Sequence, residues 1–239
     1  MVYVGTSGYN YPEWRGSFYP AKLPAKEMFG FYRERFRTVE INATFYRMPT
    51  AKITTAWLGQ APPGFRYALK APRQITHLER LQNCEDAVAF FCESARVLGA
   101  HLGPLLFQLP PQFKCDLGRF ERFLHGLPGD IRAAFEFRHE SWLVEDVYAL
   151  LQAHGVALCL ADFGDRTTPV RATARHGYLR LRDEGYTPAD LQRWAAEVIS
   201  HSANWDEVFV YFKHEEEGKG PEFAQAFLNI LKARGITAA

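Results

Sequence analysis

Eight short apolar segments, each six or seven residues long, run along the whole of this sequence. They are rich in β-branched and aromatic side chains, which is typical of strands. Strands that alternate with helices form parallel sheets, and eight such units are the number that closes a (β/α)8 barrel. The predicted strands are 2–7, 38–43, 65–70, 103–109, 132–138, 156–162, 177–182 and 207–213.

Segments with helical periodicity separate most of these strands. In 24–36 and 83–98 the apolar residues recur at the 3.6-residue period, so each helix should lay one face on the sheet. Thr187 is a predicted N-cap, and Pro188 and Pro221 stand at predicted first helical positions. Further helices are predicted at 51–60, 116–126, 141–154, 188–201 and 221–233. The segment after the sixth strand, FGDRTTPV, has no helical pattern, so we expect an irregular or missing helix there.

The alternative fold is an open, doubly wound sheet. A sheet of that kind that binds a dinucleotide usually carries G-x-G-x-x-G after its first strand, and this chain does not. No Pro- or Ser-rich linker divides the sequence. We therefore predict an α/β protein, a single (β/α)8 TIM barrel that spans residues 1–239 as one domain.

Composition excludes several classes of protein. The 28 basic and 27 acidic residues give a formal net charge of +1, which indicates neither a nucleic acid nor an anionic membrane as partner. The chain shows no secretion signal and no membrane-spanning apolar run, so we expect a cytoplasmic protein. Its four cysteines form no C-x-x-C pair, and we expect reduced thiols rather than disulfides or a zinc site.

Polar side chains alternate with apolar ones on three predicted strands. Because the outer faces of barrel strands pack on apolar helices, these polar residues should point into the lumen or lie at its C-terminal mouth, where barrel active sites are built. We expect one hydrogen-bonded cluster there. The alternating pairs are Glu40 with Asn42, Glu136 with Arg138, and Arg180 with Arg182.

Other candidates follow from their position at or after strand ends. The ends of four strands carry Lys70, Gln108, Asp162 and Lys213, and the third strand is followed by a loop with His77. An aromatic wall that stacks on a flat ligand is predicted from Tyr9, Trp14 and Trp142. The simpler alternatives are a surface histidine and ordinary aromatic packing.

The turn EEEGKGP follows the eighth strand, the usual place of a barrel phosphate site, although it lacks the spacing of a P-loop. An ordinary solvated turn is the alternative. Elsewhere the sequence has no G-x-S-x-G, no H-E-x-x-H and no EF-hand spacing. No cofactor and no metal are therefore predicted.

Seven ordered segments of the chain together resemble domain-of-unknown-function family 72, also called the YecE-like proteins. They cover residues 4 to about 226 and read GTSGYNYPEWRGSFYP, TVEINATFYRMP, LKAPRQITH, LGPLLFQLPPQF, EFRHESW, YLRLRDEGY and YFKHEEEGKGPEFA. The resemblance implies a TIM barrel and no particular reaction. Many members carry His-Gly where this chain has Arg182-Asp183, and two asparagines where it has Lys213-His214.

The leading hypothesis is an enzyme that acts on a small anionic metabolite, with a phosphate or carboxylate bound by Arg138, Arg180, Arg182 and Lys213. Glu40 or Glu136 would move a proton, and Lys70 would stabilise an oxyanion or form a Schiff base. Asp162 is a further catalytic candidate.

Three alternatives remain open from the sequence. The first is a metal-dependent phosphodiesterase or nuclease with Glu40, Glu136, Asp162 and His77 as ligands. The second is a non-catalytic protein that binds a metabolite at the same mouth. The third is an internal ion-pair network, in which Glu40 and Glu136 are matched to arginines only to fill the lumen.

Overall fold

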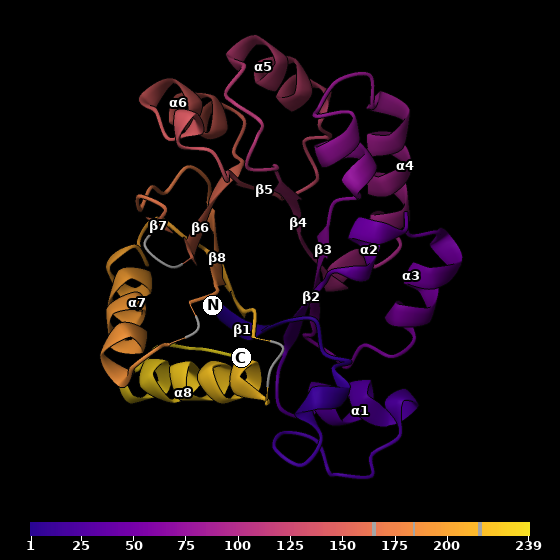
Figure 1. Ribbon diagram of the computed structural model, residues 1–239, viewed down its shortest axis with the longest axis vertical. Coiled ribbons are helices and arrows are strands. Elements are labelled where there is room, and N and C mark those ends of the chain that lie inside the picture. The colour runs from indigo at the N-terminus through magenta and orange to yellow at the C-terminus, as the bar shows by residue number, and fades with distance from the viewer. Residues whose placement is uncertain (164–165, 184, 215–216) are drawn as a thin grey trace.

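The computed structural model describes residues 1–163, 166–183, 185–214 and 217–239, and in it the eight predicted strands close into one parallel barrel (Figure 1). Neighbours around the barrel run in the order β5-β4-β3-β2-β1-β9-β8-β6, and pairing of β5 with β6 closes the ring. The strands are β1 Val2–Ser7, β2 Thr38–Ile41, β3 Arg66–Lys70, β4 Leu102–Gln108, β5 Ala133–Glu136, β6 Ala157–Phe163, β8 His176–Leu181 and β9 Glu207–Phe212. The predicted α/β barrel is confirmed.

Helices surround the strands on the outside of the ring (Figure 1). The α-helices are α1 Met28–Arg33, α2 Ala43–Tyr46, α3 Ala51–Leu58, α4 Glu85–Arg96, α5 Leu117–Gly126, α6 Glu145–Ala153, α7 Pro188–Ser200 and α8 Lys219–Ala233. Short turns of helix add η1 Pro12–Trp14, η2 Ala25–Glu27, η3 Gln74–Leu78, η4 Gly99–His101 and η5 Glu140–Trp142. In the described parts of the chain, no helix is both long and apolar enough to span a bilayer.

The predictions for the cap of α7 and for the segment after β6 are confirmed, whereas the predicted start of α8 is not. The Thr187 hydroxyl accepts the backbone N–H of Asp190 in a capping box, with Pro188 in the first turn of α7. Between β6 and β8 the described residues form no helix but a two-residue strand, β7 Arg166–Thr167, antiparallel to β6. The predicted start of α8 at Pro221 is wrong, because the helix begins at Lys219, directly after the left-handed Gly218.

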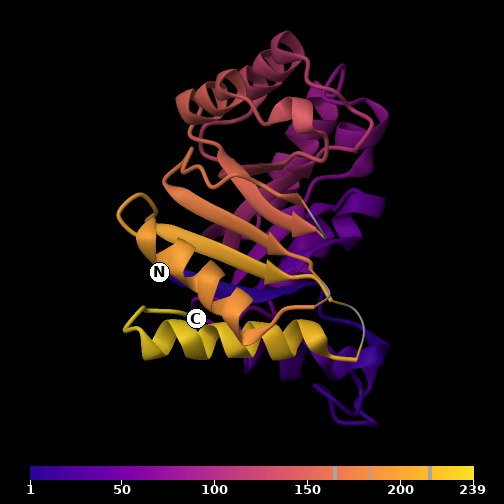
Figure 2. The same ribbon diagram turned by 60° about the vertical axis from the view of Figure 1, so that its left-hand side comes forward.

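All eight barrel strands point the same way. In Figure 2 the strand arrowheads lie toward one end of the barrel, and both chain termini lie toward the other. The mouth at the arrowhead end is therefore formed by the loops that lead from strands to helices. Residues at the last strand positions, such as Ser7, Lys70 and Glu136, share this end because the strands are parallel.

Alternate side chains of each strand face the lumen and the outside of the barrel, which gives an inner and an outer set. The outer set, which includes Leu158 and Leu160 of β6, packs with the surrounding helices in one large apolar core. The inner set forms a second, smaller core that fills the lumen: Tyr3, Ala68, Leu106, Ala134, Ala157, Cys159, Tyr178, Phe209 and Tyr211. The lumen is thus packed below the mouth, and no channel runs through the barrel at this level.

The Tyr32 hydroxyl of α1 bridges β1 and β2. It accepts the backbone N–H of Thr6 at 2.9 Å and donates to the Thr38 carbonyl at 2.9 Å. Gly5 allows this approach, since a Cβ at that position would lie 2.3 Å from the Thr38 carbonyl oxygen. Tyr32 is fully buried, so water is not available to replace its hydroxyl.

Replacing Tyr32 by Phe should therefore lower the free energy of unfolding by about 1–3 kcal/mol, because two buried backbone groups lose their partner. The matched control is Tyr148→Phe on α6. The Tyr148 hydroxyl is buried without a hydrogen-bond partner among the described residues, so its loss should change stability little. Urea unfolding of both variants measures the difference. Equal effects would contradict the bridging role of Tyr32.

Candidate functional site

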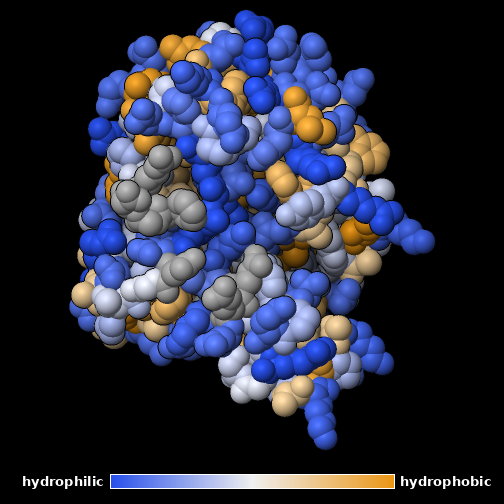
Figure 3. Space-filling view, in the orientation of Figure 1, coloured by the Kyte–Doolittle hydropathy of each residue, from blue (hydrophilic) through white to orange (hydrophobic). Residues whose placement is uncertain are grey.

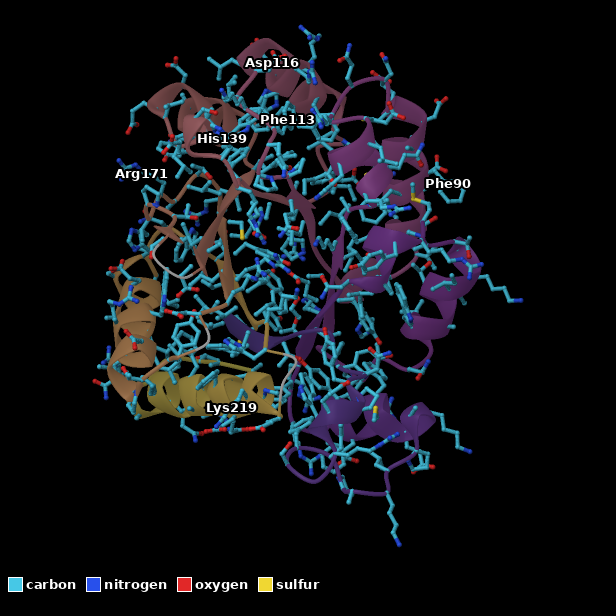
Figure 4. All side chains as sticks on the ribbon, viewed as in Figure 1. Phe90, Phe113, Asp116, His139, Arg171 and Lys219 are labelled. Atoms are coloured by element: carbon cyan, nitrogen blue, oxygen red, sulfur yellow. The ribbon has the colours of Figure 1, made fainter. Side chains whose placement is uncertain are left out.

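Arg180 of β8 crosses the lumen between two carboxylates from opposite parts of the ring. Its Nε lies 2.9 Å from one Glu40 oxygen and its Nη2 lies 2.9 Å from the other, while its Nη1 donates to Glu136. All three side chains are at most 1% exposed. Nitrogen and oxygen tips of side chains gather inside the ring of strands in Figure 4. This buried triad joins β2, β5 and β8 beneath the mouth.

The triad is extended by neighbours that satisfy the remaining carboxylate lone pairs. Glu40 also accepts the Tyr178 hydroxyl at 2.7 Å and the Ser7 hydroxyl, and Asn42 donates to Ser7 Oγ at 2.7 Å. Glu136 accepts Gln108 Nε2 at 2.9 Å and Arg138 Nε. The predicted cluster of Glu40, Asn42, Glu136, Arg138 and Arg180 is thereby confirmed as a hydrogen-bonded unit.

The environment keeps both carboxylates ionised. Burial alone would raise the pKa of Glu40 and of Glu136. The charge of Arg180 and the hydrogen bonds to each carboxylate outweigh burial, however, and hold both pKa values below their ordinary range. A carboxylate with so low a pKa and so many donors is a poor proton acceptor near neutral pH.

Lys70 ends β3 at the edge of this cluster. Its ammonium group donates to Gln108 Oε1 at 2.8 Å and lies 4.1 Å from the centre of the Phe45 ring. Because Gln108 donates its amide N–H to Glu136, its carbonyl oxygen must face Lys70. The amide of Gln108 therefore stands between the amine and the nearest carboxylate.

Burial lowers the pKa of Lys70 to about 7, and the nearby charges of Arg180 and Lys213 act in the same direction. Glu40 and Glu136 oppose this effect without reversing it. Near neutral pH a large share of Lys70 side chains thus carry a neutral amine. An amine of this kind can accept a proton or act as a nucleophile.

His77 belongs to η3, which lies beside Lys70. This element is a single π-helical turn, a feature often found at functional sites. Its ring packs edge-on against Phe45 with centroids 4.8 Å apart, and its Nδ1 lies 2.9 Å from the Thr76 hydroxyl. Burial first, and then the charges of Lys70 and Arg138, lower its pKa. The structure thus brings His77 to the same rim as Lys70.

A cavity of about 640 Å³ opens at the mouth over β5, β6 and β8. Figure 3 shows that the centre of this face is hydrophilic. Lys70 is not among the residues that line the cavity, but it lies one amide group away from Glu136, which does. The lining residues are Pro111, Glu136, Phe137, Arg138, His139, Glu140, Leu143, Ala161, Thr167, Thr168 and Arg182.

Two guanidinium groups line this one cavity. Burial lowers the pKa of Arg182, and the charge of Arg138 lowers it further. Glu136, which lines the same cavity and accepts Arg138 Nε, acts in the opposite direction on the pKa of Arg182. Glu140, which is exposed, places one carboxylate at the rim.

Lys213, the last of the predicted anion-binding cations, follows β9. Its backbone N–H donates to the Leu181 carbonyl at 3.0 Å, and its charge is felt by Lys70. Its backbone thus lies beside the end of β8. The structure does not place it in the lining of the cavity.

Asp162 lies near the C-terminal end of β6, but its carboxylate does not face the mouth, so its predicted place in the lining of the mouth is wrong. Its carboxylate accepts Trp194 Nε1 of α7 at 2.9 Å, the backbone N–H of Arg182 at 2.9 Å and the Tyr186 hydroxyl. It therefore faces α7 and anchors the loop after β8. The alternation of side chains along β6 could have predicted the outward direction of Asp162. Residues two apart share a strand face, and Asp162 therefore shares one with Leu158 and Leu160, which belong to the outer core.

The predicted aromatic wall is not at the mouth. Trp142 is fully buried, stacks on Phe137 with centroids 4.9 Å apart and donates to the Phe113 carbonyl at 2.7 Å. Figure 4 shows Phe113 beneath α5, at the outer rim. Trp14 is likewise fully buried, and Tyr9 packs on Phe29 of α1. These three residues belong to the shell of the barrel, and ordinary aromatic packing accounts for them.

The predicted phosphate turn after β9 lies partly outside the described residues, since these omit 215–216. Lys219 pairs with Glu222 of its own helix at 2.8 Å. Gly220 packs closely on the His214 carbonyl and Trp14. The described part of this turn therefore serves the packing of α8.

The four ligands of the metal-dependent alternative do not converge. Asp162 faces α7, His77 lies beside Lys70, and both remaining carboxylates are occupied by Arg180. Within the described ranges, no three His, Cys, Asp or Glu side chains are arranged so that they could hold a metal ion.

Several site residues were missed from the sequence. Tyr178 shares the inner face of β8 with Arg180, and Ser7 ends β1 beside Glu40, so strand parity could have found both. His139 directly follows Arg138 in the sequence, and its Nδ1 accepts the backbone N–H of Ser141 at 3.1 Å. Nothing in the sequence pattern places Thr167 and Thr168 at the cavity.

A model of the family described as "Protein of unknown function DUF72" matches residues 3–238 of the chain. The chain belongs to the DUF72 family. It is similar to the UPF0759 protein YecE of Escherichia coli K12, with 29% identity over 182 residues that cover 74% of this chain and 63% of YecE. It is also similar to the UPF0759 protein YunF of Bacillus subtilis 168, with 24% identity over 97% of this chain and 95% of YunF.

Solved structures of the DUF72 family share the fold. A DUF72 protein of Thermotoga maritima superposes with a TM-score of 0.83 at 26% identity, over 97% of this chain and 99% of that one. A DUF72 protein of Enterococcus faecalis gives a TM-score of 0.80 at 18% identity, over 97% of this chain and 96% of that one. A D-psicose 3-epimerase of Clostridium cellulolyticum gives 0.57 at 11% identity, over 98% and 100%, which shows a common barrel fold alone.

Replacing Lys70 by Met in this DUF72 protein should stabilise it more at about pH 6 than at about pH 10, by a difference of about 1–3 kcal/mol. Below pH 7 the folded chain bears the cost of a buried ammonium group. Between pH 7 and 10.5 the folded chain releases the proton that the unfolded chain keeps, so wild-type stability rises. Urea unfolding of both proteins at the two pH values measures the difference. A difference that does not vary with pH would show that Lys70 is an ordinary lysine.

Proposed function

We propose that this DUF72 protein is an enzyme that acts on a small anionic metabolite at the barrel mouth. Arg138 and Arg182 bind the phosphate or carboxylate group of the substrate, and Lys70 carries the proton chemistry. The observation that carries the proposal is the pair of like-charged guanidinium groups in one cavity, next to an amine with a pKa of about 7.

The anion site follows from electrostatics. Arg138 and Arg182 line the same half-buried cavity, and the charge of Arg138 lowers the pKa of Arg182 while Glu136 raises it. An oxyanion bound in this cavity would interact favourably with both guanidinium groups. Planar guanidinium groups favour phosphate and carboxylate because they can donate two parallel hydrogen bonds. The Thr167 and Thr168 residues of the same cavity offer hydroxyl groups for further contacts.

Lys70 suits proton transfer better than either carboxylate does. General acid–base catalysis is most efficient when the pKa of the group lies near the working pH. The pKa of Lys70 is about 7, whereas Arg180 keeps Glu40 and Glu136 ionised. We therefore assign the carboxylates a positioning role. They orient Arg180, Gln108 and Arg138, and through Gln108 they orient Lys70.

The buried triad and the residues at the cavity have different proposed roles. The Glu40–Arg180–Glu136 triad is sealed from water and matches the packing network considered as an alternative. Arg138, Arg182 and Lys70 are only half-buried, and they form the layer above it. We propose that this upper layer meets the substrate.

Millimolar phosphate or citrate should raise the Tm of the wild-type protein relative to chloride at equal ionic strength. An anion at roughly ten times its Kd adds about 1.4 kcal/mol, or about 3–6 °C for a chain of this size. Arg182→Met and Arg138→Met should each lose most of this rise, because each removes one of the two guanidinium groups. Thermal unfolding with each anion measures the effect.

The control variant is Arg171→Met. Arg171 lies on the outside of the barrel in Figure 4, where it pairs with Glu145, and its loss should leave the anion effect unchanged. An equal rise in all variants would place the anion elsewhere and contradict the proposal. Incubation with phosphorylated and carboxylated metabolites, followed by mass spectrometry, then separates an enzyme from a sensor. Stabilisation without any turnover would favour the non-catalytic binding protein.

A further inference from the structure

We propose that Lys70 forms a Schiff base with the carbonyl group of a phosphorylated carbonyl compound whose phosphate is bound by Arg138 and Arg182. The inference rests on the proposed function, because it takes the anion site from it. It adds the substrate class and a covalent intermediate.

The contacts of Lys70 prepare the amine for attack. Gln108 Oε1 accepts one N–H of the amine at 2.8 Å, which fixes the position of Nζ and leaves its lone pair available. The Phe45 ring lies 4.1 Å from Nζ and covers one side of the amine. The backbone is fixed as well, because the Lys70 carbonyl accepts the Thr44 hydroxyl at 2.6 Å.

The surroundings keep the amine neutral often enough to react. No carboxylate in the described ranges lies within 4.0 Å of the Lys70 ammonium group as an ion-pair partner, because Gln108 separates it from Glu136. Burial is the main cause of the lowered pKa of Lys70. The charged or titratable groups that surround it are Arg180 on β8, Lys213 after β9, Glu40 on β2, Glu136 on β5 and His77 on η3.

The separation of the amine from the anion site sets the size of the substrate. A path from Lys70 to Arg138 runs through the Gln108 amide and the Glu136 carboxylate, each joined to the next by a hydrogen bond. A substrate that lies along this path needs several bonds between its carbonyl carbon and its anionic group. A phosphorylated hydroxyketone or hydroxyaldehyde meets this requirement, whereas an α-oxo acid, with adjacent groups, does not.

The chemical step balances without any further reactant. The Nζ lone pair attacks the carbonyl carbon, and the π electrons of the C=O bond move to oxygen. Both protons of the neutral amine leave with that oxygen as one molecule of water, so a C=N bond replaces the C=O bond. Protonation of the imine then draws electrons from the neighbouring carbon and makes its protons easier to remove.

Reductive trapping tests the inference with dihydroxyacetone phosphate as probe and sodium cyanoborohydride as reductant, at about pH 7, where exposed lysines are almost entirely protonated. Intact-protein mass spectrometry and peptide mapping should find one adduct, on Lys70. Lys70→Arg and Lys70→Met should lose it, and Lys52→Met, which alters an exposed lysine of α3, should keep it. Circular dichroism confirms that the variants are folded.

Dihydroxyacetone, which has the same carbonyl group without the phosphate, is the matched probe. Trapping should be at least about tenfold slower with it, because the charged contacts of the phosphate with both Arg138 and Arg182 are absent. Arg182→Met should remove this preference while the Lys70 adduct persists. As the pH rises, the trapping rate should level off just above pH 7, whereas that of an exposed lysine keeps rising toward about pH 10.

Two results would overturn the inference. The first is adducts spread over surface lysines that persist in Lys70→Arg. The second is no adduct on Lys70 from either probe while phosphate still raises the Tm, which would leave the proposed anion site standing and remove the Schiff base. A Lys70 adduct without any preference for the phosphorylated probe, combined with no phosphate effect on Tm, would instead retain the amine chemistry and overturn the anion site.

Discussion

The Arg180 guanidinium, held between Glu40 and Glu136, is the interaction on which the mouth of this barrel depends. A buried charge is tolerated only when it is paired and its hydrogen-bonding groups are satisfied. Arg180 meets this condition by joining strands on opposite sides of the lumen, and Tyr178, Ser7 and Gln108 complete the carboxylate shells. The positions of β2, β5 and β8 at their C-terminal ends are thereby coupled to one side chain.

The buried triad helps to explain why the pKa of Lys70 is lower than that of an ordinary lysine. Removing Arg180 would leave two buried carboxylates near Lys70 and would raise its affinity for a proton, although burial would still oppose protonation. With Arg180 in place, the carboxylates are neutralised and the amine experiences burial and neighbouring cations. Gln108 connects the triad to Lys70, because its amide N–H donates to Glu136 and its carbonyl oxygen accepts from Lys70. The proposed reactivity of Lys70 thus depends on the packing of the buried Glu40–Arg180–Glu136 triad.

Membership of the DUF72 family fixes the fold but assigns no chemistry, and the likeness to a sugar epimerase at 11% identity extends to the barrel alone. The function must therefore be argued from side chains. The features that distinguish this mouth are the two arginines of the cavity and the lysine beside it. They differ in kind from the tryptophans and Asp162, which the sequence also indicated and which the structure places in the outer shell.

The strand pattern was enough to predict the barrel and its charged lumen. A period of two residues fixes which side chains share a strand face, so the strand pattern alone pairs Glu136 with Arg138, and the same parity separates Asp162 from them. Which residues meet across the ring, and what that does to their protonation, was decided by the tertiary structure. Arg180 and Glu40 are 140 residues apart, and the pKa of Lys70 depends on burial and on charges from β2, β5 and β8 and from Lys213 after β9. Both effects act through space rather than along the chain, so no local pattern contains them.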